Sequence, residues 1–197
     1  MMRYTSLVPA LVFCAAMALA AASAANASPL REGPGDDAKQ TDTDKIPIAW
    51  QHHRTTFSYF GVTVLYSCDG LEEQVRRILL YLGARGDLKV RTRGCPHGPD
   101  APTHNAWVDV DFHAPVPAGG GSADTVMAQW TRMELKPRHP SFLSEGDCEL
   151  MQDMKDLVTG SFTVRDIDYR ASCFPNPPSI DGFAVKGLTL KVAAPTR

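Results

Sequence analysis

The sequence predicts an α+β domain made of two tandem β-α-β-β units, with about six strands, two helices on one face of the sheet and two disulfides. One order of patterns, namely strand, cysteine, helix, strand, cysteine and strand, occurs twice in the chain. Between the two occurrences lies the Pro-rich and Gly-rich segment 114–124, which is typical of a connector that joins units without packing against them. We therefore place half-repeats at 47–113 and 125–194 of a single domain, 47–194.

The first half is predicted to contain three strands and one helix. Its strands, rich in β-branched and aromatic residues, are expected in 54–67, 87–95 and 105–113. A helix is expected over 70–82 because its apolar residues recur on one stripe: Leu71, Val75, Ile78, Leu79 and Leu82. Gly83 is expected to end this helix. The first two strands should run parallel through a right-handed crossover, with the third as an antiparallel neighbour.

The second half is predicted to contain the same elements. Its strands are expected in 126–136, 161–173 and 183–192. The segment 144–158 places four apolar residues on a helical stripe: Leu150, Met154, Leu157 and Val158. We interpret Met151 and Met154 as core residues of this helix, not as thioether ligands for copper. The strand 161–173 is long for its helix, so a bulge or an early bend is expected in it.

The N-terminus has the pattern of a secretory signal peptide. Arg3 precedes an apolar run, 7–22, that is rich in Leu and Ala and is followed by small residues. We expect cleavage after Ala24 or Ala27, so that at most 1–27 is removed and the mature protein is periplasmic or secreted. No membrane span is expected after signal cleavage, because the apolar run is too short for a spanning helix.

The segment 28–46 has few apolar residues and no periodicity, and is predicted to be a disordered leader. The whole chain has a formal net charge of −2. A weakly acidic protein has no global field to attract nucleic acid, so no nucleic-acid partner is expected. The expected partner is an unknown component of the envelope or the extracellular medium.

Four cysteines remain after loss of the signal peptide: Cys68, Cys95, Cys148 and Cys173. An even number in an oxidising compartment predicts a disulfide framework. Of the three connectivities, we favour Cys68–Cys95 and Cys148–Cys173, because the repeat makes each half self-sufficient. The first helix should rise about 20 Å and the strand after it should return about 23 Å, which brings Cys95 back to Cys68. The alternative is a reactive Cys68 thiolate at the helix N-terminus.

Charged residues follow two neighbouring strands of the first half. One face of the strand 105–113 carries four side chains: Trp107, Asp109, Asp111 and His113. The strand before it carries three cations on one face: Lys89, Arg91 and Arg93. A ladder of opposite charges between antiparallel neighbours explains both stripes together, and we favour it over a metal or phosphate site. In the second half three charged residues share a face in the same way: Asp166, Asp168 and Arg170.

The residues that could hold a metal are few. Weak candidates, chosen because imidazole and carboxylate are common ligands, are Asp111, His113, His97 and His104. Histidines in exposed loops are more often solvated, so we predict neither a metal nor another cofactor. The sequence contains no serine-hydrolase elbow, zinc-protease motif or phosphate-binding glycine loop, and we assign no catalytic residue.

Over roughly residues 48–193 the chain, with its "YSCDGL" and "GDCEL" motifs and its cysteines at strand ends, resembles a family of uncharacterised small exported proteins of Gram-negative bacteria. The resemblance implies a periplasmic or secreted setting. No activity is assigned to that family, so its motif positions carry over without a role: Cys68, Asp69, Gly70 and Cys148.

The sequence favours a non-catalytic binding or envelope-supporting module over an enzyme. One alternative is a periplasmic metal-binding protein that uses the four candidate ligands named above. Another is a hydrolase or thiol enzyme with a cleft between the half-repeats.

Overall fold

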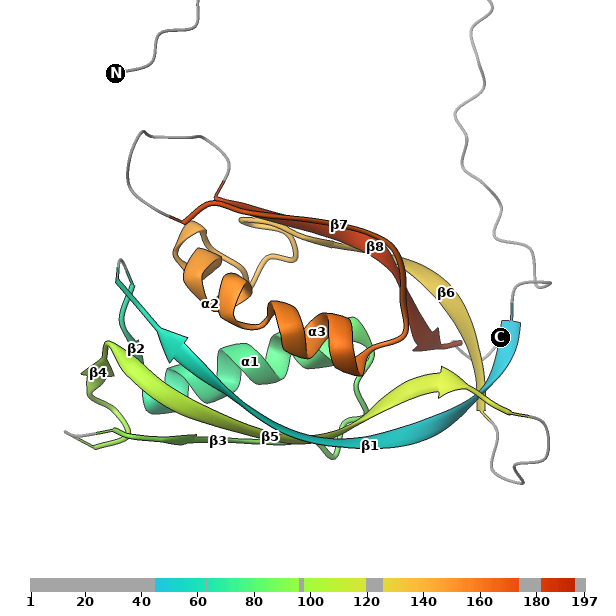
Figure 1. Cartoon of the computed structure of the whole chain (residues 1–197), viewed down its shortest axis with the longest axis horizontal. Coiled ribbons are helices and arrows are strands. Elements are labelled where there is room, and N and C mark those ends of the chain that lie inside the picture. The colour runs from blue at the N-terminus through green and yellow to red at the C-terminus, as the bar shows by residue number, and fades with distance from the viewer. Residues whose placement is uncertain (1–44, 63, 96–97, 120–125, 174–181, 194–197) are drawn as a thin grey trace, which may run out of the picture. The chain divides into compact units, whose positions relative to one another are not determined.

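The computed structural model describes residues 45–62, 64–95, 98–119, 126–173 and 182–193. Its main feature is a curved antiparallel sheet with the strand order β3-β5-β1-β6-β8-β7 (Figure 1). In chain order the strands of this sheet are β1 Lys45–Phe60, β3 Lys89–Arg93, β5 Asn105–Pro117, β6 Val126–Leu135, β7 Val164–Ala171 and β8 Phe183–Val192. Two short strands, β2 Tyr66–Ser67 and β4 Pro102–Thr103, form a separate pair.

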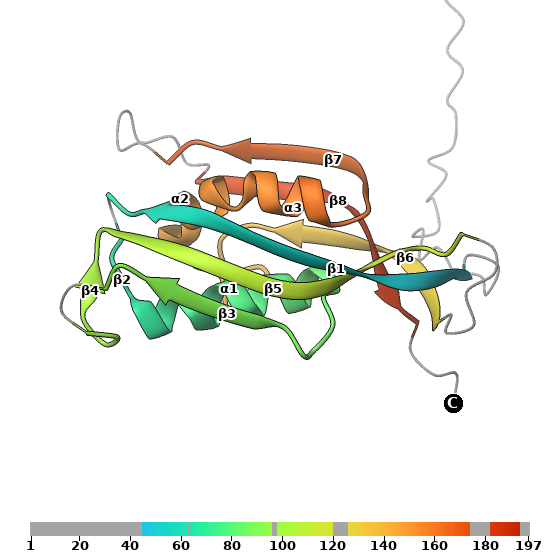
Figure 2. The ribbon, with the colours of Figure 1, turned by 60° about the horizontal axis from the view of Figure 1, so that its bottom comes forward.

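The helices lie on the concave side of the sheet, between its two halves (Figures 1 and 2). They are α1 Cys68–Leu82, the short 3-10 helix η2 Glu145–Asp147, α2 Cys148–Asp153 and α3 Lys155–Ser161. The prediction of one helix in the second half is wrong, because the chain departs from helical geometry at Met154, with φ −80° and ψ −4°. The side chain of Met154 is fully buried and therefore lies in the core at this break between α2 and α3.

Within each half the third strand lies between the other two. β5 is 13 residues long and pairs along its whole length with β1, and β3 pairs with its other edge. In the second half β8 pairs in the same antiparallel way with β6 and β7. The first two strands of each half therefore run parallel, as expected. The halves join where Lys45 to Ile48 of β1 pair with β6.

The core fills the space between the sheet and the helices. The apolar stripe predicted for α1 is completely buried, and Met151 and Met154 are core residues, as predicted. The inner face of β5 contributes five buried residues: Ala106, Val108, Val110, Phe112 and Ala114. Side chains of both halves belong to this one cluster, so burial of their apolar surface stabilises the halves together.

A second, smaller cluster lies where β1 meets β6 and β8. Its buried members are Ile48, Ala128 and Leu190, and Ile46, Trp50 and Trp130 pack against them. Each tryptophan has a guanidinium over its ring. Arg85 lies 5.7 Å from the ring centre of Trp50, and Arg165 lies 4.0 Å from that of Trp130.

The ends of α1 follow from local sequence. Ser67 caps the first turn, since its Oγ accepts a hydrogen bond of 3.1 Å from the Gly70 amide. Gly83 ends the helix with φ 106°, as predicted. A side chain at Gly83 would also collide with the Leu190 carbonyl of β8, so glycine is required both for its backbone conformation and for the close approach of β8.

Some predicted boundaries are wrong. The strand expected over 54–67 begins at Lys45, inside the expected leader 28–46, because β6 supplies pairing partners that a local pattern does not reveal. It ends at Phe60, since Gly61 turns the chain close against Tyr59 and Val64. β5 continues to Pro117, so the predicted connector 114–124 begins later. The signal peptide lies outside the described residues.

The bulge expected in the strand 161–173 is present. The pairing of β7 with β8 shifts register between Arg165 and Asp168, and Asp166 has φ 51°. The bulge takes Asp166 out of the regular alternation, so the predicted three-residue stripe is reduced to Asp168 and Arg170. Their side chains form an ion pair of 2.7 Å.

Both disulfides have the predicted pairing. Cys68 is bonded to Cys95 with a Cα–Cα distance of 6.4 Å, and Cys148 is bonded to Cys173 with a Cα–Cα distance of 5.5 Å. Such bonds indicate an oxidising compartment. In the part of the chain that the structure describes, no helix has the length and apolar content needed to cross a bilayer.

Replacing Cys68 and Cys95 together by serine is expected to lower the free energy of unfolding by about 3.5 kcal/mol, because the bond closes a loop of 27 residues in the unfolded chain. Urea denaturation of the oxidised protein measures the loss. The matched control replaces Cys148 and Cys173, whose separation of 25 residues predicts nearly the same cost. A loss below about 1 kcal/mol for the first pair would contradict the expectation.

Candidate functional site

The outer surface of β3, β5 and β1 carries the most distinctive set of polar and aromatic side chains. Alternation along each strand sends one set of residues into the core and the next set outward. We call the outward set the open face. It consists of His52, Arg54, Thr56, Ser58 and Phe60 of β1, Lys89, Arg91 and Arg93 of β3, and Trp107, Asp109, Asp111 and His113 of β5.

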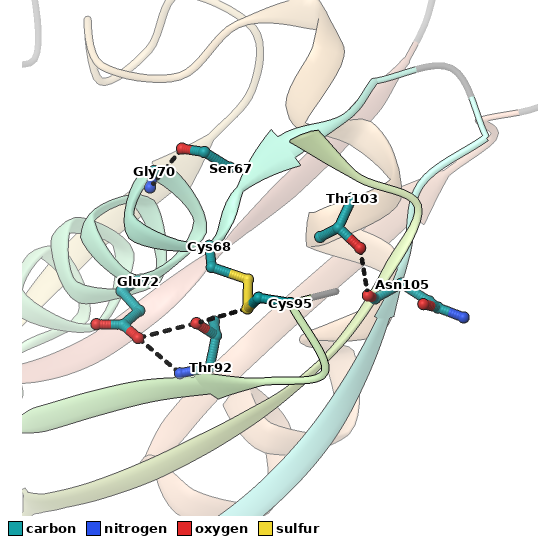
Figure 3. Close-up of a disulfide and its surroundings, with 8 residues drawn as sticks. All are labelled: Ser67, Cys68, Gly70, Glu72, Thr92, Cys95, Thr103 and Asn105. Atoms are coloured by element: carbon teal, nitrogen blue, oxygen red, sulfur yellow. Dashed lines mark hydrogen bonds between the residues drawn. A yellow bond between two sulfur atoms is a disulfide. The ribbon is translucent and has the colours of Figure 1, made fainter. Parts of the chain in front are cut away.

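The edge strand β3 is held in place from the inner side by α1. Glu72 accepts hydrogen bonds from the Thr92 amide at 2.7 Å and from the Thr92 hydroxyl at 2.9 Å (Figure 3). The Cys68–Cys95 bond ties the start of α1 to the end of β3 in the same region (Figure 3). Helix, disulfide and strand together fix the neighbouring positions Arg91 and Arg93 on the open face.

The predicted charge ladder between β3 and β5 is present. Lys89 lies opposite Asp111, and Arg91 lies opposite Asp109. The closest contact is diagonal, because Arg93 donates two hydrogen bonds to Asp109, at 2.6 and 2.9 Å. Such paired charges orient the side chains of an exposed sheet surface.

Asp109 is held ionised by its donors. Besides Arg93, the Thr56 hydroxyl of β1 donates a hydrogen bond of 2.6 Å to its carboxylate. These hydrogen bonds, with Arg93 the larger cause, lower the pKa of Asp109 to about 2. The carboxylate is therefore negatively charged at any pH near neutrality, and it lies in the middle of the open face.

Besides Lys89 on β3, Asp111 has two neighbours on β1. His52 Nε2 lies 2.9 Å from one carboxylate oxygen, and Arg54 Nε lies 3.9 Å from the other. The hydrogen bond with His52 is the main reason that the pKa of Asp111 is lowered. The sequence reasoning missed both partners, because it did not identify β1 as the second neighbour of β5.

The open face carries more cations than carboxylates. Asp109 and Asp111 are its two carboxylates, against four cations: Arg54, Lys89, Arg91 and Arg93. A shallow hollow of about 670 Å³ lies over these charges and Thr56. Arg91 is exposed within it, and no carboxylate of the described residues is within ion-pair distance of its guanidinium. The charge ladder therefore leaves positive charge available to a ligand.

Two large aromatic side chains are exposed at one end of the open face. Trp107 is 53% exposed and Phe60 is 60% exposed. A smaller hollow of about 260 Å³ lies between them, lined also by Ser58, Gly94 and Asn105. The amide of Phe60 donates a hydrogen bond of 2.9 Å to Asp153 of α2, which fixes this end of β1. Trp107 was on the predicted face, whereas Phe60 was not identified from the sequence.

The candidate metal ligands are not brought together. Asp111 and His113 share the open face, but Arg85 Nη2 lies 3.0 Å from His113 Nδ1. His104 lies beyond the other end of β5, 3.2 Å from the Gly61 carbonyl. His97 lies outside the described residues. Across the described ranges no three His, Cys, Asp or Glu side chains have the spacing of a metal site.

Two further histidines lie beside this group. The ring of His52 is 5.0 Å from that of His113, while His53 points inward and stacks on Phe112 at 5.4 Å. Burial, followed by the nearby His52 and His113, lowers the pKa of His53. The neutral form of the half-buried His53 is therefore favoured.

A buried polar network joins the two halves at the end near Phe60. Asp147, 2% exposed, accepts hydrogen bonds from Tyr66, from Gln74 at 2.8 Å and from the Ser144 hydroxyl at 2.9 Å. Burial and the bond to Asp147 raise the pKa of Tyr66. Sequence reasoning missed this network, although Gln74 is a polar residue between turns of the apolar stripe and Ser144 and Asp147 have the spacing of a helix cap.

Glu149 extends this junction to the loop that follows β1. Its carboxylate accepts a hydrogen bond of 2.8 Å from the Val62 amide. Glu149 and Asp153 belong to the second half, and each accepts a hydrogen bond from a backbone amide of the first half. These carboxylates therefore satisfy backbone donors at the end of β1 and support this end of the open face.

The alternative of a reactive Cys68 thiolate finds no free thiol here, since all four described cysteines are in disulfides. The space between the halves, where a cleft was considered, is occupied by the core side chains described above. The chain matches no protein-family model, no curated protein and no solved structure.

The Asp109 carboxylate is expected to titrate with a midpoint of about 2, which NMR of the side-chain carboxyl carbon measures directly. Because the folded-state pKa is lowered, the contribution of Asp109 to stability is present above its ordinary pKa of 3.8 and is lost as the pH falls through about 2. Arg93→Gln should move the midpoint up towards 3.8.

Arg132→Gln is the control for this titration, since Arg132 is an exposed arginine in β6, in the other half of the sheet. It should leave the Asp109 midpoint unchanged. An unchanged midpoint in Arg93→Gln would show that Arg93 does not hold the charge of Asp109.

Proposed function

We propose that the protein is an exported, non-catalytic binding module that uses the open face of β3, β5 and β1. The observation that carries the proposal is the exposed Trp107 on a face whose cations outnumber its carboxylates, with Arg91 outside ion-pair distance of any carboxylate of the described residues. Folded monomers expose few large aromatic side chains in such groups, and tryptophan and arginine are enriched where proteins bind partners. Support also comes from the rigid placement of these side chains on strands.

The proposed location is the periplasm or the extracellular medium, reached after cleavage of the signal peptide following Ala24 or Ala27. The two disulfides support an oxidising compartment. The binding partner is then an envelope or extracellular component, in agreement with the resemblance to small exported proteins of Gram-negative bacteria. Nucleic acid is not the proposed partner.

We further propose that the two halves arose from one duplicated β-α-β-β unit. The equal strand order of the halves supports this. The spacing of matching residues supports it as well. The same number of residues separates Trp50 from Trp130, Cys68 from Cys148, and Arg85 from Arg165. Both tryptophans carry an arginine over the ring. The open face would then be a specialisation of the first half, because no tryptophan of the second half corresponds to Trp107.

The alternatives have weaker support. A metal-binding protein would rely on Asp111, His113 and neighbouring His52, but Arg85 places a positive charge against His113. A thiol enzyme would need reduction of a disulfide. A hydrolase would need a nucleophile and a base in a shared pocket, and the open face offers neither arrangement.

Replacement of Trp107 by the photo-crosslinking residue p-benzoylphenylalanine tests the binding face. On irradiation of cells that export the protein, we expect an adduct of defined mobility at position 107, because a bound partner covers this side chain. Gel electrophoresis before and after protease digestion of the adduct tells a protein partner from a polysaccharide.

The matched control places the same crosslinker at Arg132, in the other half of the sheet. No such adduct should form there. Equal adducts at both positions, or none at either, would count against a binding role for the open face.

A further inference from the structure

We infer that the open face binds an acidic polysaccharide, with a sugar ring stacked on Trp107 and acidic groups held by Arg91 and the neighbouring cations. This inference rests on the proposed function and adds the chemical class of the ligand. It is carried by three features of the face: an accessible indole in polar surroundings, a surplus of positive charge, and fixed carboxylates between the cations.

Apart from Phe60 across the smaller hollow, Trp107 has small or polar neighbours on the open face. Ser58 is its partner on β1 and Arg93 is its partner on β3. Gly94 follows with φ 86°, and a side chain there would touch the indole ring at 3.7 Å. The absence of that side chain leaves room beside the ring. A sugar has an apolar C–H face for the indole and a rim of hydroxyl groups for polar neighbours, so the surroundings of Trp107 fit it.

The charged residues continue from Trp107 as a row along β5. Successive outward residues of a strand lie nearly 7 Å apart, so Trp107, Asp109 and Asp111 span about 14 Å. Arg91 on β3 and Arg54 on β1 lie on opposite sides of this row. A chain of several sugar units can therefore contact the indole and the cations together, whereas a single small anion cannot.

The carboxylates distinguish a polysaccharide from a nucleic acid. Asp109 is held ionised, with a pKa of about 2, between the cations. A DNA strand has a phosphate at every unit and no free sugar hydroxyl within the chain to donate to this carboxylate. A polysaccharide has hydroxyl groups that can donate hydrogen bonds to Asp109 and Asp111. Its acidic groups can contact the exposed ends of Arg91 and Lys89, neither of which has a carboxylate of the described residues within ion-pair distance.

The test is affinity electrophoresis of the purified, oxidised protein through gels containing polygalacturonate, a polymer of acidic sugar units. We expect retardation by polygalacturonate, less by neutral dextran, and a retardation that decreases with salt because the cations contribute. Trp107→Ala should weaken binding about tenfold, the effect typical of losing an aromatic anchor. Arg91→Gln should weaken it several-fold and reduce its salt dependence. Arg132→Gln is the matched control and should bind like the unaltered protein.

Circular dichroism and thermal unfolding establish that each variant is folded before its mobility is compared. Failure of polygalacturonate to retard the protein, or tighter binding of an oligothymidylate, would overturn the polysaccharide assignment. If the crosslink at position 107 persists in that case, the binding face stands and only the ligand class is wrong. If the crosslink is also absent, the proposed function fails with it.

Discussion

The long ladder between β1 and β5 is the constraint on which the rest of the structure depends. It pairs Ile48 with Pro117 at one end and Phe60 with Asn105 at the other. Because side chains alternate between the two faces, a shift of one residue in this register would turn Trp107, Asp109 and Asp111 into the core and bring Val108 and Val110 to the surface. The buried face of β5 thus fixes the composition of the open face: burial of apolar residues on one side determines which polar residues meet the solvent.

The second half of the sheet has little backbone pairing with the first half. Only the start of β1 pairs with β6, so the halves are held together mainly by the shared core and by the network around Asp147. Buried carboxylates are costly unless every oxygen is used, and Asp147 meets this condition with donors from both halves. Asp153, in the helix that follows Asp147, accepts the hydrogen bond from the Phe60 amide at the end of the open face.

Local patterns of the sequence were sufficient for the strand-helix-strand-strand order, for the cysteine pairing and for the charge ladder of β3 with β5. These features depend on residues close in the chain or on alternation within one strand. The contributions of β1 to the open face could not be predicted, because His52 and Thr56 meet the β5 carboxylates only through a pairing more than 50 residues apart in sequence. The division of the second helix into α2 and α3 had no local signal either. Met154 fits the predicted helical stripe, and it is buried in the structure just as it would be in a single helix.

Edge protection is the competing explanation for the basic stripe. β3 is an edge strand, and exposed lysine and arginine on an edge discourage pairing with another chain. That explanation accounts for Lys89, Arg91 and Arg93, and Glu72 adds to the protection by occupying the Thr92 amide. It does not account for Trp107, which is on the interior strand β5 and gains nothing from exposure. Nor does it require Arg54, on the far side of β5. An exposed indole on an interior strand, with cations of both neighbouring strands further along the same face, is instead what a ligand that lies across the three strands would require.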